Sequence, residues 1–286
     1  MIDYTILQQS LAHQTFGPGL YLVATPIGNL ADLSLRALET FEKADLVLCE
    51  DTRVTGALLK MLGLKKTLWS YHDHNEDRQG PKIIEELKKG KIIVLVSDAG
   101  TPLISDPGYK LVEDVRKQGI HVTSVPGPVA FVNALILSGL PTDRFFFGGF
   151  LPHKGKKKVL EQYKAFPFVL IFYEGPTRIK STLAAIHEIL GDRFVVLAKE
   201  LTKKFEQVTG GQTSDLLAKL DQINLKGEFV ILVAPSSEPL SEETSLKVYE
   251  DTLKIFSLKE GATHLAKALG KSKREVYQKL LETKKL

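Results

Sequence analysis

The chain has 286 residues, of which 43% are hydrophobic and 25% charged, and its net charge is +4. This composition is typical of a water-soluble globular protein, and the length fits two domains with a small appendage. A single cysteine, Cys49, excludes an internal disulfide and a cysteine-cluster zinc site. No apolar run is long enough to span a membrane, and the first residues do not resemble a signal peptide. We therefore expect a cytoplasmic location and no membrane partner.

Strands and helices alternate through the first half of the chain. Apolar runs predict strands over residues 20–24, 46–49, 68–71, 91–96 and 121–125. Helical spacing and glycine or proline boundaries predict helices over residues 33–41, 54–62, 81–89, 109–118 and 129–137, with Pro81 opening the third. This alternation predicts parallel βαβ units and an α/β fold.

A second α/β set begins near Leu140. We expect strands over residues 144–147, 168–173, 194–198 and 228–234, a helix over 179–190 and a basic loop over 154–158. A proline- and serine-rich linker follows at residues 235–239. The sequence therefore predicts domains at residues 1–128, 129–237 and 238–286.

The C-terminal tail is expected to be helical and basic. Two short amphipathic segments, 263–269 and 273–281, resemble a helix-turn-helix unit, with a shared core of Ala266, Leu269, Val276, Tyr277 and Leu280. Residues 259–286 contain eight Lys or Arg and three Glu, so this segment carries +5 and the rest of the chain −1. A polyanionic partner would explain the excess, and a solvated helix face is the alternative.

Residues 97–108 are the most restrained stretch of the chain. They follow a buried strand and contain Pro102 and Pro107 together with Gly100 and Gly108. An ordinary strand-to-helix turn needs only about 2–6 residues. Twelve residues at the carboxyl end of a parallel strand, beginning with Ser97 and Asp98, therefore favour a ligand-binding loop.

Two further turns, residues 25–29 and 126–128, are rich in proline and glycine and also follow predicted strands. Together the three turns predict a pocket whose walls are mainly backbone, which suits a zwitterionic, adenine-bearing ligand. The usual P-loop and dinucleotide-binding glycine motifs are missing. His72 and His74 have no matching set of further ligands, so we expect a polar surface loop and no metal site.

Several motifs resemble the bacterial ribosomal RNA small subunit methyltransferase I family, which belongs to the tetrapyrrole-methylase superfamily. They are LVATPIGNL at 22–30, CEDTR at 49–53, SDAGTP at 97–102, VPGP at 125–128, SGLPTDRF at 138–145, YE at 173–174 and KELTK at 199–203. The match runs from about Gly19 to Ala234, and the basic tail is similar to that family's C-terminal domain. The chain departs from the commoner patterns at Ala24, Val129 and residues 175–177.

The resemblance implies two α/β domains of tetrapyrrole-methylase type with the cofactor cleft between them, plus a small helical domain. It implies S-adenosyl-L-methionine as methyl donor, a homodimer, and 2′-O-methylation of a decoding-site cytidine (cytidine 1402) of 16S rRNA in the 30S ribosomal subunit. By motif, the cofactor-binding residues would be Pro26, Gly28, Asp98, Ala99, Gly100, Thr101, Pro102, Pro126 and Gly127.

A ribose 2′-OH becomes a good nucleophile only as it loses its proton, so a positioned base is expected. The candidates for catalysis stand at predicted strand ends: Glu50, Asp51 and Glu200 as proton acceptors, with Arg53, Arg178 and Lys199 as phosphate or alkoxide partners. Each could equally form a structural ion pair.

The candidates for RNA binding are Lys154, Lys156, Lys157, Lys158, Lys267, Lys271, Lys273 and Arg274. Two other functions stay open. One is a tetrapyrrole C-methyltransferase on the same fold, although a small porphyrinoid needs no basic tail. The other is a ligand-sensing regulator that binds nucleic acid through the tail without turnover.

Overall fold

The computed structural model describes residues 15–164, 166–236, 249, 257–269 and 271–284. The chain forms two compact units, one comprising Met1–Ala134 with Glu200–Gln207 and the other Leu135–Lys199 with Val208–Leu286. The chain therefore leaves the first unit at Ala134, returns to it for eight residues and leaves it again.

The first unit contains a five-stranded sheet in the order β3-β2-β4-β1-β5. Its strands are β1 (Gly19–Val23), β2 (Leu46–Cys49), β3 (Leu68–Ser70), β4 (Ile92–Leu95) and β5 (Val122–Val125). All neighbouring pairs are parallel, which confirms the predicted βαβ units. Their carboxyl ends therefore lie at one edge of the sheet.

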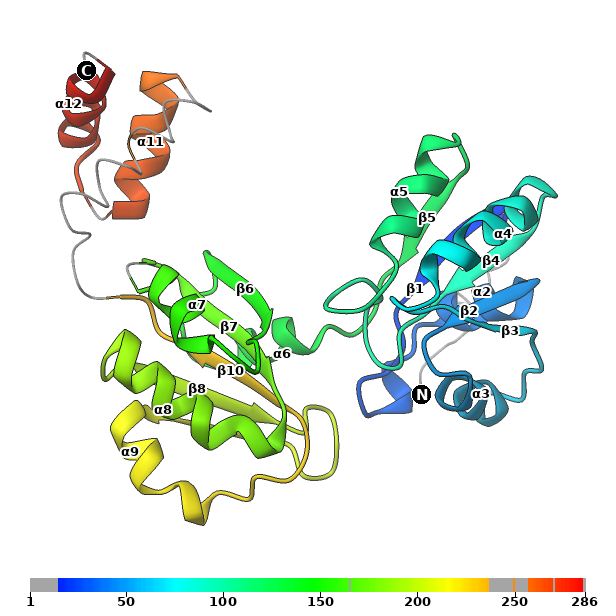
Figure 1. The fold of residues 1–286 in the computed structure, drawn as a ribbon, viewed down its shortest axis with the longest axis horizontal. Coiled ribbons are helices and arrows are strands. Elements are labelled where there is room, and N and C mark those ends of the chain that lie inside the picture. The colour runs from blue at the N-terminus through cyan, green and yellow to red at the C-terminus, as the bar shows by residue number, and fades with distance from the viewer. Residues whose placement is uncertain (1–14, 165, 237–248, 250–256, 270, 285–286) are drawn as a thin grey trace, which may run out of the picture. The chain divides into compact units, whose positions relative to one another are not determined.

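Helices cover both faces of this sheet (Figure 1). The helices are α2 (Leu35–Lys43), α3 (Thr52–Met61), α4 (Glu76–Lys88) and α5 (Tyr109–Lys117), with a 3₁₀ turn at Leu30–Asp32. On one face, Phe41 of α2 and Leu59 of α3 pack against Val47 and Val94. On the other face, α4 and α5 contribute Ile83 and Leu111 to a separate core. Burial on both faces explains why these strands are continuous apolar runs without polar alternation.

The start of α4 differs from the sequence prediction. The helix begins at Glu76, so part of the expected polar loop is helical and Pro81 lies inside the helix. Pro81 costs the helix one backbone hydrogen bond close to its first turn, and Glu76 and Asp77 in that turn interact favourably with the positive end of the helix dipole. These acidic residues indicated a helix start that the sequence analysis placed at the proline.

The second unit contains a mixed sheet in the order β6-β7-β10-β8-β9. Its strands are β6 (Phe145–Phe150), β7 (Val169–Glu174), β8 (Phe194–Lys199), β9 (Gln207–Gln212) and β10 (Phe229–Val233). β6 is parallel to β7, and β10 is antiparallel to both β7 and β8. β9 was not among the predicted strands, because its residues are mostly exposed and polar.

Five helices or short turns accompany this sheet: α7 (Lys156–Gln162), α8 (Ile179–Leu190), α9 (Thr213–Ala218) and 3₁₀ turns at Pro176–Arg178 and Leu220–Gln222. Leu183 and Ile186 of α8 pack on Phe172 and Ile231 in the main core. Helix α6 (Ala130–Leu137) contains the point where the chain passes from one unit to the other. The prediction of a basic loop over residues 154–158 is wrong in part, because residues 156–158 form the first turn of α7.

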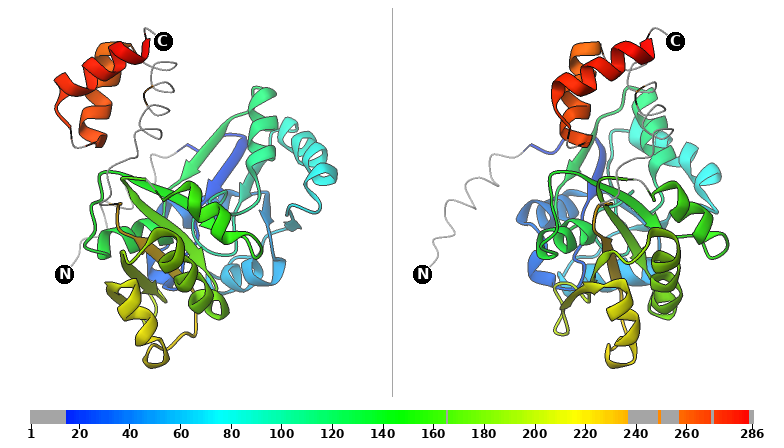
Figure 2. Two further views of the ribbon diagram at one scale, coloured as in Figure 1. Left: turned by 60° about the vertical axis from the view of Figure 1, so that its left-hand side comes forward. Right: turned by 90° about the vertical axis from the view of Figure 1, so that its left-hand side faces the viewer.

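Two helices near the C-terminus, α11 (Leu258–Leu269) and α12 (Lys273–Lys284), lie side by side (Figure 2). Ala262, Leu265, Val276 and Leu280 form their core together with Tyr249. Tyr277, expected in this core, is 38% exposed, and the side chain of Leu269 lies outside the described residues. No helix in the described part of the chain is long and apolar enough to cross a membrane.

Each of these two helices begins with a capping box. Ser257 donates its hydroxyl to Glu260 Oε2 at 2.6 Å and accepts from the Glu260 backbone N–H. Ser272 and Glu275 repeat the arrangement at 2.7 Å. Reciprocal caps of this kind satisfy the free N–H groups of the first turn and fix where a short helix starts.

Candidate functional site

The loops that follow β1 and β4 are joined at the carboxyl edge of the first sheet. Thr25 N donates to Gly100 O at 2.8 Å, and Gly100 N donates to Thr25 O at 3.1 Å. Thr25 is only 2% exposed, and its hydroxyl lies 3.5 Å from the carbonyls of Ser97 and Gly100. This bridge holds the Thr25–Asn29 turn against the 97–108 loop that the sequence analysis singled out.

The same loop is tied to two neighbouring strand ends. Asp98 Oδ1 accepts a hydrogen bond from Asp51 N, directly after β2, at 3.1 Å. The hydroxyl of Thr101 donates to Pro128 O, in the turn after β5, at 3.0 Å. The structure therefore brings together strand-end turns that are far apart in the sequence.

Backbone strain is concentrated in two short segments. Among the described residues, the non-glycine residues with positive φ are Leu103, Ser105, Glu200 and Thr202. Two belong to the 97–108 loop and two to the 200–207 segment of the same unit. Left-handed conformations of such residues cost free energy, and they are typically found where function requires a fixed backbone.

Three glycines at this edge could not carry a side chain without displacing a neighbour. A Cβ on Gly100, whose φ is +83°, would lie 3.2 Å from Ile27 Cγ2. A Cβ on Gly127 would lie 2.8 Å from Ala24 Cβ, and one on Gly28 would collide with Lys203. The side chains of Ile27, Ala24 and Lys203 therefore lie too close to these glycines for a Cβ to be added without a shift.

Carboxyl groups gather on the same edge. Partial desolvation of the largely exposed Glu50 and the nearby Asp98 carboxylate raise the pKa of Glu50. Burial raises the pKa of Asp106 to about 6, an effect that a hydrogen bond from Ser97 opposes and the charges of Glu50 and Asp98 reinforce. The site is thus electronegative and favours a cationic ligand.

Asp51 and Arg53 have a structural role in the fold. Asp51 caps α3 by accepting from Arg53 N at 2.8 Å, and its carboxylate also pairs with the Arg53 guanidinium at 2.5 Å. These bonds lower the pKa of Asp51 to about 2. A carboxylate held at so low a pKa is a weak proton acceptor at neutral pH.

Arg178 is also engaged within the fold. Its Nε contacts Glu174 Oε1 at 2.5 Å and its Nη1 donates to Leu151 O at 2.9 Å. Glu174 is 2% exposed and also accepts from the Thr182 hydroxyl at 2.6 Å. Removing the Arg178 side chain would leave this buried carboxylate short of a partner, so Arg178 serves to hold the end of β7.

Lys199 and Glu200 are sequence neighbours that belong to different units. Lys199 ends β8 and is 4% exposed, in register with Phe229 of β10. Glu200 has a φ of +49° and its Oε1 accepts from Lys203 Nζ at 3.0 Å.

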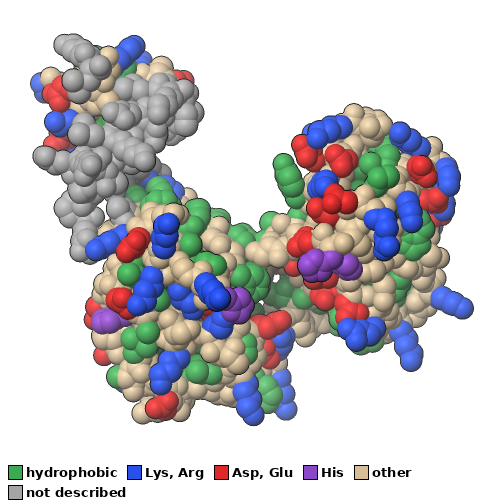
Figure 3. Space-filling view, viewed as in Figure 1, with side chains coloured by type: hydrophobic (Ala, Val, Ile, Leu, Met, Phe, Trp, Pro, Cys, Tyr) green, Lys and Arg blue, Asp and Glu red, His purple; other side chains and the backbone are tan. Residues whose placement is uncertain are grey.

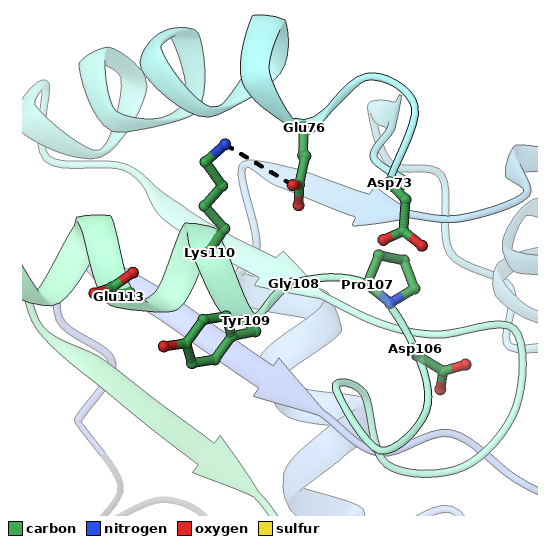
Figure 4. Close-up of a pocket in the computed structure, with 8 residues that line it drawn as sticks. All are labelled: Asp73, Glu76, Asp106, Pro107, Gly108, Tyr109, Lys110 and Glu113. Atoms are coloured by element: carbon green, nitrogen blue, oxygen red, sulfur yellow. Dashed lines mark ion pairs between the residues drawn. The ribbon is translucent and has the colours of Figure 1, made fainter. Parts of the chain in front are cut away.

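Beside the 97–108 loop lies an acidic hollow (Figure 4). It is lined by Asp73, Glu76, Asp106, Pro107, Gly108, Tyr109, Lys110 and Glu113. Pro107 lies between the carboxylates of Asp73 and Asp106 in the close-up, and Lys110 pairs with Glu76 at 3.9 Å. The described residues contain no group of three or more His, Cys, Asp or Glu side chains arranged to hold a metal ion.

Comparison with known proteins identifies the family. The family model for tetrapyrrole (corrin/porphyrin) methylases matches residues 19–217. The ribosomal RNA small subunit methyltransferase I of Mesorhizobium japonicum is 43% identical over 97% of this chain and 96% of its own length. The enzyme of the same name from Haemophilus influenzae is 45% identical over 91% of this chain and 95% of its own length. The chain belongs to the ribosomal RNA small subunit methyltransferase I family.

Solved structures share the fold of this methyltransferase family member. Diphthine synthase superposes with a TM-score of 0.61 at 15% identity, covering 75% of this chain and 89% of its own. The uroporphyrin-III-C-methyltransferase of Thermus thermophilus superposes with a TM-score of 0.54 at 21% identity, covering 76% of this chain and 94% of its own. Both confirm the predicted tetrapyrrole-methylase fold.

The basic residues of this family member are only partly available to a partner. Lys156 Nζ donates to Ser181 and Thr182 hydroxyls at 3.0 and 2.9 Å, and Lys157 pairs with Glu188. Lys154 and Lys158 are exposed, and Figure 3 shows Lys and Arg side chains gathered over α7. Lys156 therefore has a structural role in addition to any contact with RNA.

In the tail, Lys271, Lys273 and Arg274 are exposed around the start of α12. The side chain of Lys267 lies outside the described residues.

Two residues of the site were not named as candidates from the sequence. Asp106 is one, although the Asp-Pro-Gly run at 106–108 inside a restrained loop indicated it. Lys203 is the other. It appeared only as the last residue of a family motif, because no sequence pattern places it against Gly28.

Proposed function

We propose that this protein uses S-adenosyl-L-methionine to methylate the ribose 2′-OH of a cytidine, cytidine 1402, in 16S rRNA of the 30S subunit. The observation that carries the proposal is the set of interlocked turns at the carboxyl edge of the first sheet. Residues 25–28, 97–103 and 126–128 form it, and they include every cofactor-binding residue expected from the family motifs.

The residues of this edge fit the proposed cofactor. Gly100 and Gly127 let the turns pack closely on Ile27 and Ala24, which holds the backbone groups of this edge in place. The carboxylates of Asp98, Asp106 and Glu50 would attract a ligand that carries an ammonium and a sulfonium charge. When bound, the cofactor supplies a methyl group on a positively charged sulfur. Pro26, Ala99, Thr101, Pro102 and Pro126 complete the proposed binding set.

Among the acidic candidates, Glu50 is the best proton acceptor for the ribose hydroxyl. Partial desolvation and Asp98 raise its pKa toward the range in which a carboxylate accepts a proton efficiently, whereas Arg53 lowers that of Asp51. Glu200 stays a secondary candidate for the base, because it already pairs with Lys203, and Lys199 stays a candidate partner for a phosphate or the alkoxide. The chain would also have to hold the hydroxyl oxygen in line with the methyl group.

Contact with the ribosomal subunit would come from the basic tail and the exposed lysines near α7. Lysine ammonium groups bind phosphates without reading bases, so they would contribute affinity and not choice of nucleotide. We also propose that the protein acts as a homodimer, as its family motifs imply.

The test is methyl transfer from radiolabelled cofactor. Small subunits from a strain lacking the modification, naked 16S rRNA and a porphyrinoid substrate would be compared, and labelled RNA digested to nucleosides. We expect label in 2′-O-methylcytidine from the subunit. Label in the porphyrinoid alone would favour a tetrapyrrole C-methyltransferase, and binding of RNA and cofactor without transfer would favour a regulator.

A further inference from the structure

The eight-residue segment Glu200–Gln207, here called the arm, belongs to the first unit, although β8 before it and the rest of β9 after Gln207 belong to the second. Leu201 anchors the arm, since it is only 6% exposed. Lys203 N donates to Glu200 O at 3.0 Å, Glu206 N donates to Lys203 O at 3.0 Å, and Thr202 N donates to Glu206 Oε2 at 2.6 Å. The arm is therefore a compact, internally bonded loop.

The stem of Lys203 lies directly on Gly28. A Cβ built on Gly28 would overlap Lys203 Cγ and lie 2.9 Å from Cε and 3.1 Å from Cδ. Three methylene groups thus occupy the space in front of the Gly28 backbone. The ammonium group at the end of the stem donates to Glu200 Oε1 at 3.0 Å, which fixes the stem in place.

The contact continues from Gly28 into the loop at the end of β4. Ile27, next to Gly28, is the residue that a Cβ on Gly100 would meet, at 3.2 Å. Thr25, at the start of the same turn, is bonded to Gly100 through both backbone groups. The arm therefore packs on the 25–29 turn, and this turn packs on the 97–103 loop.

We propose that Lys203 is a positioning residue for the cofactor site, acting through the packing of its methylene stem on Gly28. This inference rests on the proposed function for the identity of the ligand. The positive φ values of Glu200 and Thr202 support it, because a strained arm is retained where its geometry is needed. The role belongs to the hydrocarbon stem, and the ammonium group serves to orient it.

The test compares three variants. Lys203→Ala removes the stem, Lys203→Met keeps a stem of similar length without the charge, and Lys204→Ala is the matched control on an adjacent exposed lysine. Hydrogen exchange of peptides covering residues 25–29 is measured on the ligand-free protein, and affinity for S-adenosyl-L-methionine by calorimetry. KM for the cofactor and kcat are measured separately.

We expect Lys203→Ala to exchange faster across residues 25–29 and to bind the cofactor about tenfold more weakly, within the range usual for supporting contacts. KM for the cofactor should rise more than kcat falls. Lys203→Met should lose much less than Lys203→Ala in all three readouts, because it keeps the stem, and Lys204→Ala should match wild type.

Wild-type exchange and affinity in Lys203→Ala would overturn the inference. Equal loss in Lys203→Met and Lys203→Ala would also overturn it, because the ammonium group would then be responsible. If the wild-type protein itself does not bind the cofactor, the proposed function fails, whereas the exchange measurement still decides whether Lys203 holds the 25–29 turn.

Discussion

At the scale of single residues, Asp106 shows how the loop's burial affects an ionisable group. Its pKa rises from an ordinary 3.8 to about 6, mainly because burial disfavours the charged form. Between about pH 4 and pH 6 the folded protein therefore holds this proton more firmly than the unfolded chain does. The stability that the folded protein gains from holding this proton is fully present below about pH 4, and it is lost as the pH rises to about 6.

We therefore predict that Asp106→Asn gains stability relative to wild type as the pH rises from about 4 to 6, with no further gain above that window. Thermal unfolding across this range checks the prediction. Asp192→Asn is the control of opposite sign, because hydrogen bonds from Ser214 lower the pKa of Asp192. In that variant the wild-type advantage should be present at neutral pH and shrink in acid. A pH-independent difference for Asp106→Asn would contradict the assignment.

Glu50 and Asp51 are adjacent carboxylates with opposite pKa shifts. We predict that Glu50→Gln lowers the rate of methyl transfer by about 10²-fold or more, since a general base acts on the chemical step, and weakens cofactor binding far less, through the loss of one of three nearby carboxylate charges. Asp51→Asn should keep much of the rate, because asparagine can still cap α3. Single-turnover kinetics and calorimetry together separate the two effects. A wild-type rate in Glu50→Gln would exclude it as the base.

At the scale of elements, the 97–108 loop depends on glycine for both its conformation and its packing. We predict that Gly100→Val abolishes measurable cofactor binding, because a branched side chain would push on Ile27 and displace the bridge to Thr25. Gly119→Ala is the matched control. Gly119 has a similar φ of +70°, but a Cβ there meets no atom within 4 Å. It should lower the melting temperature and leave binding intact. Unchanged affinity in a folded Gly100→Val would contradict the role of the loop.

The sequence predicted those elements whose residues are buried on both sides. Strands β2, β4 and β10 are apolar throughout, so their position and the ligand loop after β4 could be inferred. β9 could not, because its alternating Gln, Val, Thr and Gly residues are exposed at the edge of a sheet that only tertiary pairing creates. The start of α4 was misplaced and α7 was not predicted for a related reason, since the first turns of both helices are polar.

The candidate site was predicted in the same uneven way. The three turns at residues 25–29, 97–108 and 126–128 could be placed at one edge of the sheet, because the carboxyl ends of parallel strands lie at the same edge. Three side-chain contacts could not be predicted, since each depends on side-chain geometry. They join Asp51 to Arg53, Arg178 to Glu174 and Lys203 to Gly28.

At the scale of the whole molecule, the C-terminal helices have a small core of their own, formed by Val276, Leu280 and their neighbours. We predict that deleting the residues after Pro239 leaves cofactor affinity nearly intact. The same deletion should weaken binding to small subunits and flatten its salt dependence, because fewer counterions are released. Filter binding over a range of salt concentrations measures both effects.

Charge reversal in the full-length chain tests the basic residues of the tail directly. Reversing the charges of Lys271, Lys273 and Arg274 should reproduce most of the loss, whereas reversing the exposed Lys60, Lys82 and Lys88 is the matched control. If the truncated protein keeps the wild-type salt slope, the tail does not bind RNA, and the exposed lysines near α7 become the better candidates.

The arm also determines how this protein can be divided or recombined. Because Glu200–Gln207 belongs to the first unit, residues 1–134 alone do not make up that unit. A chimera that joins the first 134 residues to the second half of another methylase would keep the glycine at position 28 but take the whole arm that covers it from the other protein. Exchange of halves between relatives therefore requires two grafts, and a single crossover in α6 transfers an incomplete site.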